Sequence, residues 1–333
     1  MNRNRSIKRT LPAAMYYLLF LLFAVQPVRA EQWYSYYDAL CTSVVGGSNA
    51  YRDITHFKDK FIAIGTNGRI DGISQSGGIM RLKSVCQENL NSAYSNEEIF
   101  LAVGDHGIIL YSTNGTSFSR AVSGTEKNIF GIACKNGLFV VGADSGTILI
   151  SNTGLTWKSI PTAIRGNILS ISANNSCFFG VTDSGEIIKS FDGIKWTIQD
   201  YNREYAGYNQ YSIFRKILAS PNSMTIIGIH KDGSPSIIYS SLGNVWAERP
   251  PIYQDDQGVV QGLTNKPNGI AYVPELDQFV VACDNGELLA LPPCSKCNKW
   301  EKISEKNLHA ICYFDNCLLI VGEEFSVSIQ RVR

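Results

Sequence analysis

Residues 99–118 read IFLAVGDHGIILYSTNGTSF, and this stretch decides the fold. It contains an apolar run, a short polar turn that closes on Gly107, a second apolar run, and a Ser-x-x-Gly-x-x-aromatic motif from Ser112 to Phe118. Apolar runs rich in β-branched and aromatic residues, joined by a tight turn, are typical of strands in a hairpin. At the motif, serine and asparagine side chains bond the backbone of a turn, which predicts a second hairpin.

The same stretch recurs along the chain. It returns at 138–157 (LFVVGADSGTILISNTGLTW) and at 177–196 (CFFGVTDSGEIIKSFDGIKW), each 39 residues after the last. The glycines that close the first turn follow this spacing: Gly68, Gly107, Gly146 and Gly185. The second motif begins at Ser112, Ser151, Ser190 and Ser240 and ends at Phe118, Trp157, Trp196 and Trp246. Wider copies of the first turn follow at 231–233 and 283–286, and a degenerate seventh lies at 321–326.

Each repeat predicts four strands. In the third unit we place them at 128–135, 138–143, 147–151 and 157–161, and no long helical periodicity appears after residue 30. Four-stranded units at a period of about 40–50 residues are typical of propeller blades. We therefore expect an all-β, seven-bladed β-propeller of four-stranded antiparallel blades. The last unit lacks a fourth strand, and we expect residues 31–40 to supply it and close the ring.

The first thirty residues have the order of a secretory signal peptide. Basic residues precede an apolar run from Leu11 to Val25, and small residues at Val28 and Ala30 predict cleavage after Ala30. An uncleaved anchor is the alternative, although the run is short for a membrane span. The remaining 31–333 form one propeller domain, expected to be secreted or periplasmic and without a further membrane span. It has 25 basic and 29 acidic side chains, which argues against a general nucleic-acid binder.

All nine cysteines lie after the leader, so export would expose them to oxidising conditions. We expect Cys41 and Cys86 to form a disulfide, because both follow the last strands of blades that would be neighbours. Cys294 and Cys297 offer half of a zinc site, but no second pair completes four ligands. The four histidines are scattered, so we expect neither a metal nor a cofactor.

The second motif resembles the Asp-box, or BNR, repeat of sialidase-like propellers, although only Asp192 keeps the family's aspartate. The whole chain after the leader resembles the bacterial WD-type/YVTN/BNR-like superfamily, including the photosystem II assembly-factor group. In such propellers each blade has strands A to D from the axis outward. The resemblance implies that the B–C turns and the D–A connections share one face, called the top, and that the Ser-x-x-Gly motifs lie on the bottom. Recurrence of Asp105, Asp144, Asp183 and Asp284 at equivalent turns favours a turn-forming role over catalysis.

Two long D–A loops are the predicted binding site. Their candidate residues are Arg203, Tyr205, Tyr208, Tyr211, Tyr253, Asp255 and Asp256. Tyrosine and arginine together suit a protein or glycan contact. The loops run from Asp200 to Tyr211, which includes Tyr201, and from Pro250 to Gly262. The alternative is that they pack on their own aromatic residues.

No catalytic constellation is evident in the sequence. A sialidase-like enzyme would need an arginine triad, which Arg52, Arg165 and Arg215 could supply, but the family's Arg-Ile-Pro segment is missing. We therefore predict a non-catalytic binding scaffold that docks a protein or an envelope component through its top face. A carbohydrate-active propeller, either a glycosidase or a lectin, is the alternative.

Overall fold

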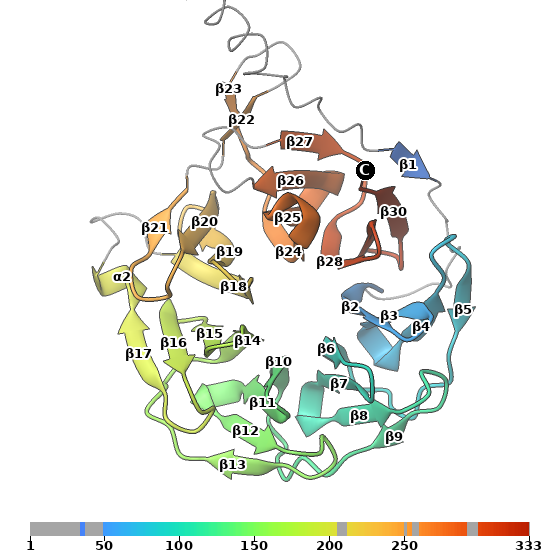
Figure 1. The fold of residues 1–333 in the computed structure, drawn as a ribbon, viewed down its shortest axis with the longest axis vertical. Coiled ribbons are helices and arrows are strands. Elements are labelled where there is room, and N and C mark those ends of the chain that lie inside the picture. The colour runs from blue at the N-terminus through green and yellow to red at the C-terminus, as the bar shows by residue number, and fades with distance from the viewer. Residues whose placement is uncertain are drawn as a thin grey trace, which may run out of the picture.

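The computed structural model is a ring of seven β-sheets around a central axis, as Figure 1 shows. The structure describes residues 34–36, 49–204, 212–249, 252–254, 260–291 and 299–332. The predicted leader, 1–30, lies outside these residues. In the described part of the chain, no helix is long and apolar enough to span a bilayer. The predicted fold class is confirmed.

Each blade is a four-stranded antiparallel sheet with its strands in the order A to D. Blade 1 contains β2 (Tyr51–Phe57), β3 (Lys60–Gly65), β4 (Ile70–Ile73) and β5 (Ile79–Arg81). Blade 2 contains β6 (Leu90–Ser95), β7 (Phe100–Gly104), β8 (Ile109–Ser112) and β9 (Ser119–Arg120). Blade 3 contains β10 (Ile129–Lys135), β11 (Leu138–Ala143), β12 (Ile148–Ser151) and β13 (Lys158–Ile160). Blade 4 contains β14 (Ile168–Ala173), β15 (Phe178–Thr182), β16 (Glu186–Ser190) and β17 (Thr197–Asp200).

The second half of the ring has wider connections between its blades. Blade 5 contains β18 (Ser212–Ala219), β19 (Met224–His230), β20 (Pro235–Ser240) and β21 (Ala247–Glu248). Blade 6 contains β24 (Pro267–Val273), β25 (Gln278–Cys283), β26 (Glu287–Leu291) and β27 (Lys299–Lys302). Blade 7 contains β28 (Leu308–Phe314), β29 (Cys317–Gly322), β30 (Val327–Arg331) and β1 (Tyr34–Tyr36). A short helix, α2 (Tyr201–Glu204), follows blade 4, and a hairpin of β22 (Ile252–Gln254) and β23 (Val260–Gly262) lies beside β27 (Figure 1).

The core is divided into seven apolar clusters, and each cluster is shared by two neighbouring blades. The period of two in a strand produces this division, because alternate side chains point to opposite faces. In β7, Phe100 and Ala102 pack toward blade 1, whereas Leu101 and Val103 pack toward blade 3. Every blade is therefore covered on both faces only when the ring is complete.

Residues near the N-terminus close the ring, as predicted. β1 pairs antiparallel with β30, and Tyr34, Ser35 and Tyr36 lie opposite Arg331, Gln330 and Ile329. The pairing makes β1 the outermost strand of blade 7 (Figure 1). The two ends of the propeller are thus held in one sheet, which leaves no open blade.

The Ser-x-x-Gly motifs form the C–D turns, also as predicted. The hydroxyl of Ser151 accepts a hydrogen bond from the amide of Gly154 at 2.9 Å. Gly154 has a φ of 75°, and a Cβ there would lie 3.1 Å from Leu101 of the preceding blade. Glycine is therefore required both by the backbone conformation and by the close approach. The same serine-to-glycine bond occurs in blades 2, 4 and 5.

The closing aromatic residues of this motif differ in burial. Trp246 is 2% exposed and belongs to the cluster between blades 4 and 5. Trp157 and Trp196 are only partly buried at the edges of their clusters, where the indole N–H of each donates to the carbonyl of the motif glycine. All three side chains thus pack between neighbouring sheets, but only Trp246 is fully buried.

The structure describes one of the two cysteines of the predicted disulfide, Cys86. Cys41, Cys294 and Cys297 lie outside the described residues. The six described cysteines form no disulfide with one another. Cys86 is a partly buried thiol in the connection between blades 1 and 2.

Candidate binding face

The top face is formed by the B–C turns and the D–A connections, which lie against each other. The turn η2 (Asp105–Gly107) closes on Gly107, whose φ is 70°. A Cβ at Gly107 would lie 1.9 Å from the carbonyl oxygen of Thr125, in the connection to the next blade. The corresponding turns of blades 1, 3 and 6 are η1 (Thr66–Gly68), η3 (Asp144–Gly146) and η5 (Asp284–Gly286). Their glycines approach the following connection in the same way.

An asparagine at the start of strand A fastens each of these turns to the next blade. The side-chain oxygen of Asn89 accepts the backbone N–H of Asn67 in blade 1 at 3.0 Å. Its side-chain nitrogen donates to the carboxylate of Asp105 in its own blade at 2.8 Å. Equivalent asparagines at the other such junctions are Asn128, Asn167 and Asn307. The four recurring aspartates each accept a hydrogen bond from an asparagine near the start of strand A in their own blade, which supports the structural role predicted for them.

The middle residue of each top-face turn is exposed. In blades 1 to 3 these residues are Asn67, His106 and Ser145, with φ between 54° and 55°. The corresponding exposed residues of blades 4 to 7 are Ser184, Asp232, Asn285 and Glu324. The surrounding hydrogen bonds hold the backbone of these turns, so the side chains project from fixed positions. The residue type at this position differs from blade to blade.

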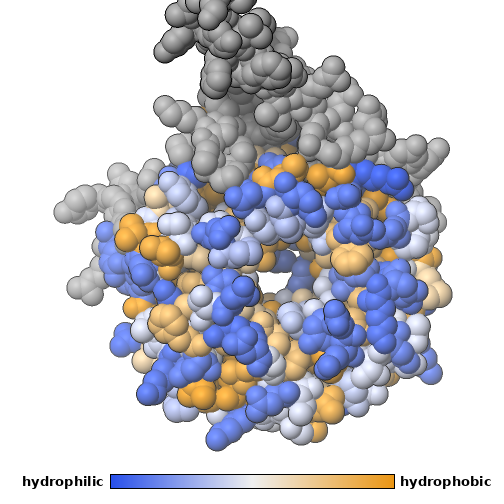
Figure 2. Space-filling model, in the orientation of Figure 1, coloured by the Kyte–Doolittle hydropathy of each residue, from blue (hydrophilic) through white to orange (hydrophobic). Residues whose placement is uncertain are grey.

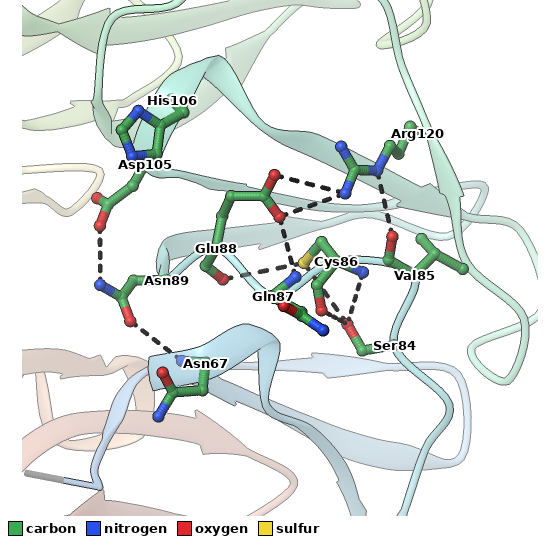
Figure 3. A pocket seen from close by; sticks show the side chains of 10 residues that line it. All are labelled: Asn67, Ser84, Val85, Cys86, Gln87, Glu88, Asn89, Asp105, His106 and Arg120. Carbon is green, nitrogen blue, oxygen red and sulfur yellow. Dashed lines mark hydrogen bonds and ion pairs between the residues drawn. The ribbon is translucent and has the colours of Figure 1, made fainter. Parts of the chain in front are cut away.

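An open groove of about 850 Å³ lies on the top face between blades 1 and 2 (Figure 3). Its floor is the connection from Ser84 to Asn89, and its sides are the turns that contain Asn67 and His106. Arg120, from the outer strand β9, completes it. The groove is therefore assembled from two repeats and does not exist in either one alone.

Charge in the groove is paired but accessible. Arg120 lies 3.3 Å from the carboxylate of Glu88 and donates to the carbonyl of Val85 at 3.2 Å. Backbone amides, that of Glu88 itself first, hold the pKa of this carboxyl below its usual range, and Arg120 adds to the effect. Burial raises the pKa of the Cys86 thiol, so the thiol stays protonated at neutral pH and is a poor nucleophile. The groove thus offers hydrogen-bond donors and acceptors, and none of these observations points to a catalytic nucleophile.

The central channel is lined by the innermost strands of all seven blades and encloses about 400 Å³. Its opening is visible in Figure 2, with both hydrophilic and hydrophobic residues around it. Lys216 of blade 5 reaches Asp53 of blade 1, with 3.4 Å between the ammonium and the carboxylate. Since these blades are not neighbours, this ion pair crosses the channel.

The predicted loop site is described only at its edges. Tyr201 is 4% exposed and packs on Phe214 with ring centroids 5.6 Å apart, so its role is structural. Asn202 is also buried and exchanges hydrogen bonds with the backbone of Ser212. Arg203 lies in α2 and Tyr253 in β22, but the positions of their side chains are not described. The remaining candidates lie outside the described residues: Tyr205, Tyr208, Tyr211, Asp255 and Asp256.

The three arginines considered for a sialidase-like triad lie at three different blade junctions. Arg52 bonds to Asn91 of blade 2, and Arg215 bonds to Asn268 of blade 6. Arg165 is exposed in the connection between blades 3 and 4. Arg52 and Arg215 are thus each bonded to an asparagine of the next blade, at two different junctions.

The described histidines are likewise dispersed. His56 stacks on Phe314 with ring centroids 3.3 Å apart, and His230 lies 2.6 Å from the carboxylate of Glu248. His309 bonds to the backbone carbonyl of Tyr51. Within the described ranges, no group of His, Cys, Asp and Glu side chains is arranged to hold a metal ion.

Comparison with known proteins finds similarity of fold. No family model matches the sequence, and no curated protein matches it either. A solved structure of YCF48 bound to D1 peptide is 15% identical with a TM-score of 0.65, and the match covers 91% of this chain and 95% of that one. YCF48 from Cyanidioschyzon merolae is 14% identical with a TM-score of 0.64, over 90% of this chain and 98% of that one. The WD40 propeller domain of Doa1 is 12% identical, also with a TM-score of 0.64, over the same shares of the two chains.

These identities establish architecture and not activity. They confirm, at the level of the fold, the resemblance to WD-type and assembly-factor-like propellers that the repeat motifs indicated. The chain is a seven-bladed β-propeller with the fold of the WD40 and YCF48 propellers.

Proposed function

We propose that this chain is an exported, non-catalytic scaffold that docks a protein through its top face. The observation that supports this most directly is the polar groove between blades 1 and 2. It is open and rigidly framed, and its side walls are exposed turn residues. Surfaces of this kind suit recognition, since loops on a rigid scaffold are where binding residues concentrate.

The hydrogen bonding of the groove favours a peptide-like partner. The backbone N–H of Asn67 already donates to Asn89 and that of His106 to Asn128, so these turn donors keep a partner when water is displaced. His106 and Arg120 remain exposed and can present donors, and Glu88 can present an acceptor. An extended backbone, with alternating N–H and C=O groups, matches such a mixed lining.

The two D–A loops extend the proposed contact surface to the other side of the ring. They hold Arg203, Tyr205, Tyr208 and Tyr211 in the first loop, and Tyr253 with Asp255 and Asp256 in the second. Tyrosine gives contact area at low entropic cost, and arginine adds a directional donor. One protein of similar fold, YCF48, has a solved structure bound to D1 peptide, which gives a precedent for peptide binding on this fold.

Capture from an envelope extract with matched variants tests the proposal. One variant changes His106 and Arg120 to alanine, and a second changes Arg203, Tyr205 and Tyr208 to alanine. The control changes Thr113 and Thr116, both exposed in the C–D turn of blade 2 on the bottom face, to alanine. We expect each top-face variant to bind the same partner about tenfold more weakly, a loss of roughly 1.4 kcal/mol in binding free energy. Its melting temperature should be unchanged.

Two results would count against it. If the bottom-face control lost as much of the captured partner as the top-face variants, the contact would not lie on the top face. Hydrolysis of a glycan by the purified chain, or binding of a glycan that the top-face variants abolish, would favour the carbohydrate-active alternative.

A further inference from the structure

Four large apolar side chains are exposed at the bottom of blades 4 and 5. Phe191 is 69% exposed and Ile194 51% exposed in the C–D turn of blade 4. Leu242 is 73% exposed and Val245 70% exposed in the C–D turn of blade 5. Single exposed apolar residues are common, but four on two adjacent turns form a patch that calls for an explanation.

The turn itself does not require apolar residues. In blade 2 the positions equivalent to these four are occupied by Thr113, Thr116, Asn114 and Ser117. Nevertheless the turn geometry is the same. The motif glycine donates to the motif serine at 2.9 Å in blade 2 and at 2.8 Å in blades 4 and 5. The apolar side chains are therefore an addition to the repeat at one sector of the ring.

Lysine side chains fix the two apolar turns relative to their neighbours. The ammonium of Lys189 donates to the carbonyl of Leu242 and, at 2.8 Å, to the side chain of Asn244. The ammonium of Lys135 donates to the carbonyl of Phe191 at 2.6 Å. Because these bonds join blade 3 to blade 4 and blade 4 to blade 5, one flat surface could contact both turns together.

Charge on the bottom face is unevenly distributed. The sector with the apolar turns is basic, and its lysines are Lys135, Lys158, Lys189 and Lys195. Its acidic side chain, Asp192, accepts bonds from the amides of Ile194 and Lys195. The A–B turns of blades 6 and 7 carry carboxylates instead: Glu275, Asp277 and Asp315.

We propose that this edge of the bottom face docks onto an anionic lipid bilayer. The four apolar side chains enter the interfacial region, and the lysines contact lipid phosphates. The acidic side chains of blades 6 and 7 are repelled by the same surface, so the ring meets the bilayer on the edge formed by blades 4 and 5. The top face then remains free for its partner.

Composition and shape favour a bilayer over a protein partner. Leucine and valine are under-represented among the residues that dominate protein interfaces, and lysine is depleted there. The four side chains project from turn tips, and none of them lines the hollow of about 240 Å³ between blades 5 and 6. Aliphatic tips flanked by lysines match an interface that is apolar below and negatively charged above.

Sedimentation with lipid vesicles tests the proposal. The protein is purified from its native cells, so that it carries the processing that those cells give it. The vesicles contain phosphatidylcholine alone or with about one-third phosphatidylglycerol. The test variant replaces the patch with its counterparts from blade 2: Phe191→Thr, Ile194→Thr, Leu242→Asn and Val245→Ser. The control, Met80→Gln, removes a residue that is 53% exposed on blade 1.

We expect the unaltered chain and the control to sediment with the anionic vesicles and to be released by high salt. The four-residue variant should partition at least about tenfold more weakly, because it forfeits apolar contact with the bilayer, while its melting temperature is unchanged. Absence of sedimentation would overturn the proposal and would favour a protein as the partner of the apolar patch. Sedimentation that is independent of the four substitutions, or equal on uncharged vesicles, would also overturn it.

Discussion

Replacing Gly107 with alanine tests how closely the top-face turns are held against the next connection. The left-handed backbone, with a φ of 70°, costs a residue with a Cβ about 1–2 kcal/mol. The new methyl group would lie 1.9 Å from the carbonyl oxygen of Thr125 and 3.1 Å from the hydroxyl of Ser123, so the backbone must move. Overpacking of this kind costs about 1–3 kcal/mol. The expected loss of stability is the sum of the two, about 2–5 kcal/mol.

Gly137 provides the matched control for this prediction. Its φ is 78°, but a Cβ there would meet nothing within 4 Å. Gly137→Ala should therefore lower the free energy of unfolding only by the cost of the left-handed backbone, about 1–2 kcal/mol. Equilibrium unfolding in urea measures both variants, with equal slopes as evidence that the unfolded states are alike. Equal losses at the two positions would refute the tight contact between turn and connection.

Three further outcomes follow from the geometry. In the same assay, Trp246→Ala should lower the free energy of unfolding by about 3–5 kcal/mol, because Trp246 is fully buried. Trp157→Ala should lower it clearly less, because Trp157 is only partly buried, and equal losses would contradict this. Removing residues 31–40 should lower the midpoint of the whole transition by deleting the strand that closes the ring, and an unchanged midpoint would show that closure does not depend on it. Because the pKa of Glu88 is lowered in the folded state, its carboxylate stabilises the fold at pH values above the ordinary glutamate pKa. This stabilisation is lost as the pH falls through the lower pKa of the folded state. Arg120→Gln should raise that pKa in an NMR titration, whereas an unchanged pKa would mean that the backbone amides act alone.

The repeat could be predicted from sequence because it depends on local chemistry. Turn glycines such as Gly107 and turn serines such as Ser151 are dictated by the backbone of their own hairpin, so their spacing reveals the blades. Closure by residues 31–40 was predictable for a related reason, since the last unit lacked one strand. Each of these features needs only the pattern within a repeat unit.

Features that depend on contacts between repeats were missed. Asn89 bonds to Asp105 ahead of it and to Asn67 behind it, so its role spans two units. The recurrence of asparagine at Asn89, Asn128 and Asn167 has the same 39-residue spacing as the glycines and could have revealed this network.

Burial was the other quantity that sequence could not supply. The motif places Trp157 at the edge of a blade, but the neighbouring blade decides how much of it is covered. Tyr201 was expected in a binding loop and is instead buried against Phe214. The groove of Figure 3 depends on Glu88, in the connection between blades 1 and 2, and on Arg120, in the outer strand of blade 2, and the two have no motif in common.

Site-specific photocrosslinking in the native cell tests the central claim most directly. A photoreactive amino acid is placed at His106 on the top face and, in a separate chain, at Asn136 in the exposed A–B hairpin of blade 3 on the bottom face. The proposed function predicts a discrete crosslink from His106 to one exported or envelope protein, and none of that size from Asn136. A protein crosslink from Asn136 alone, or no protein crosslink from His106, would contradict a top-face protein-binding scaffold.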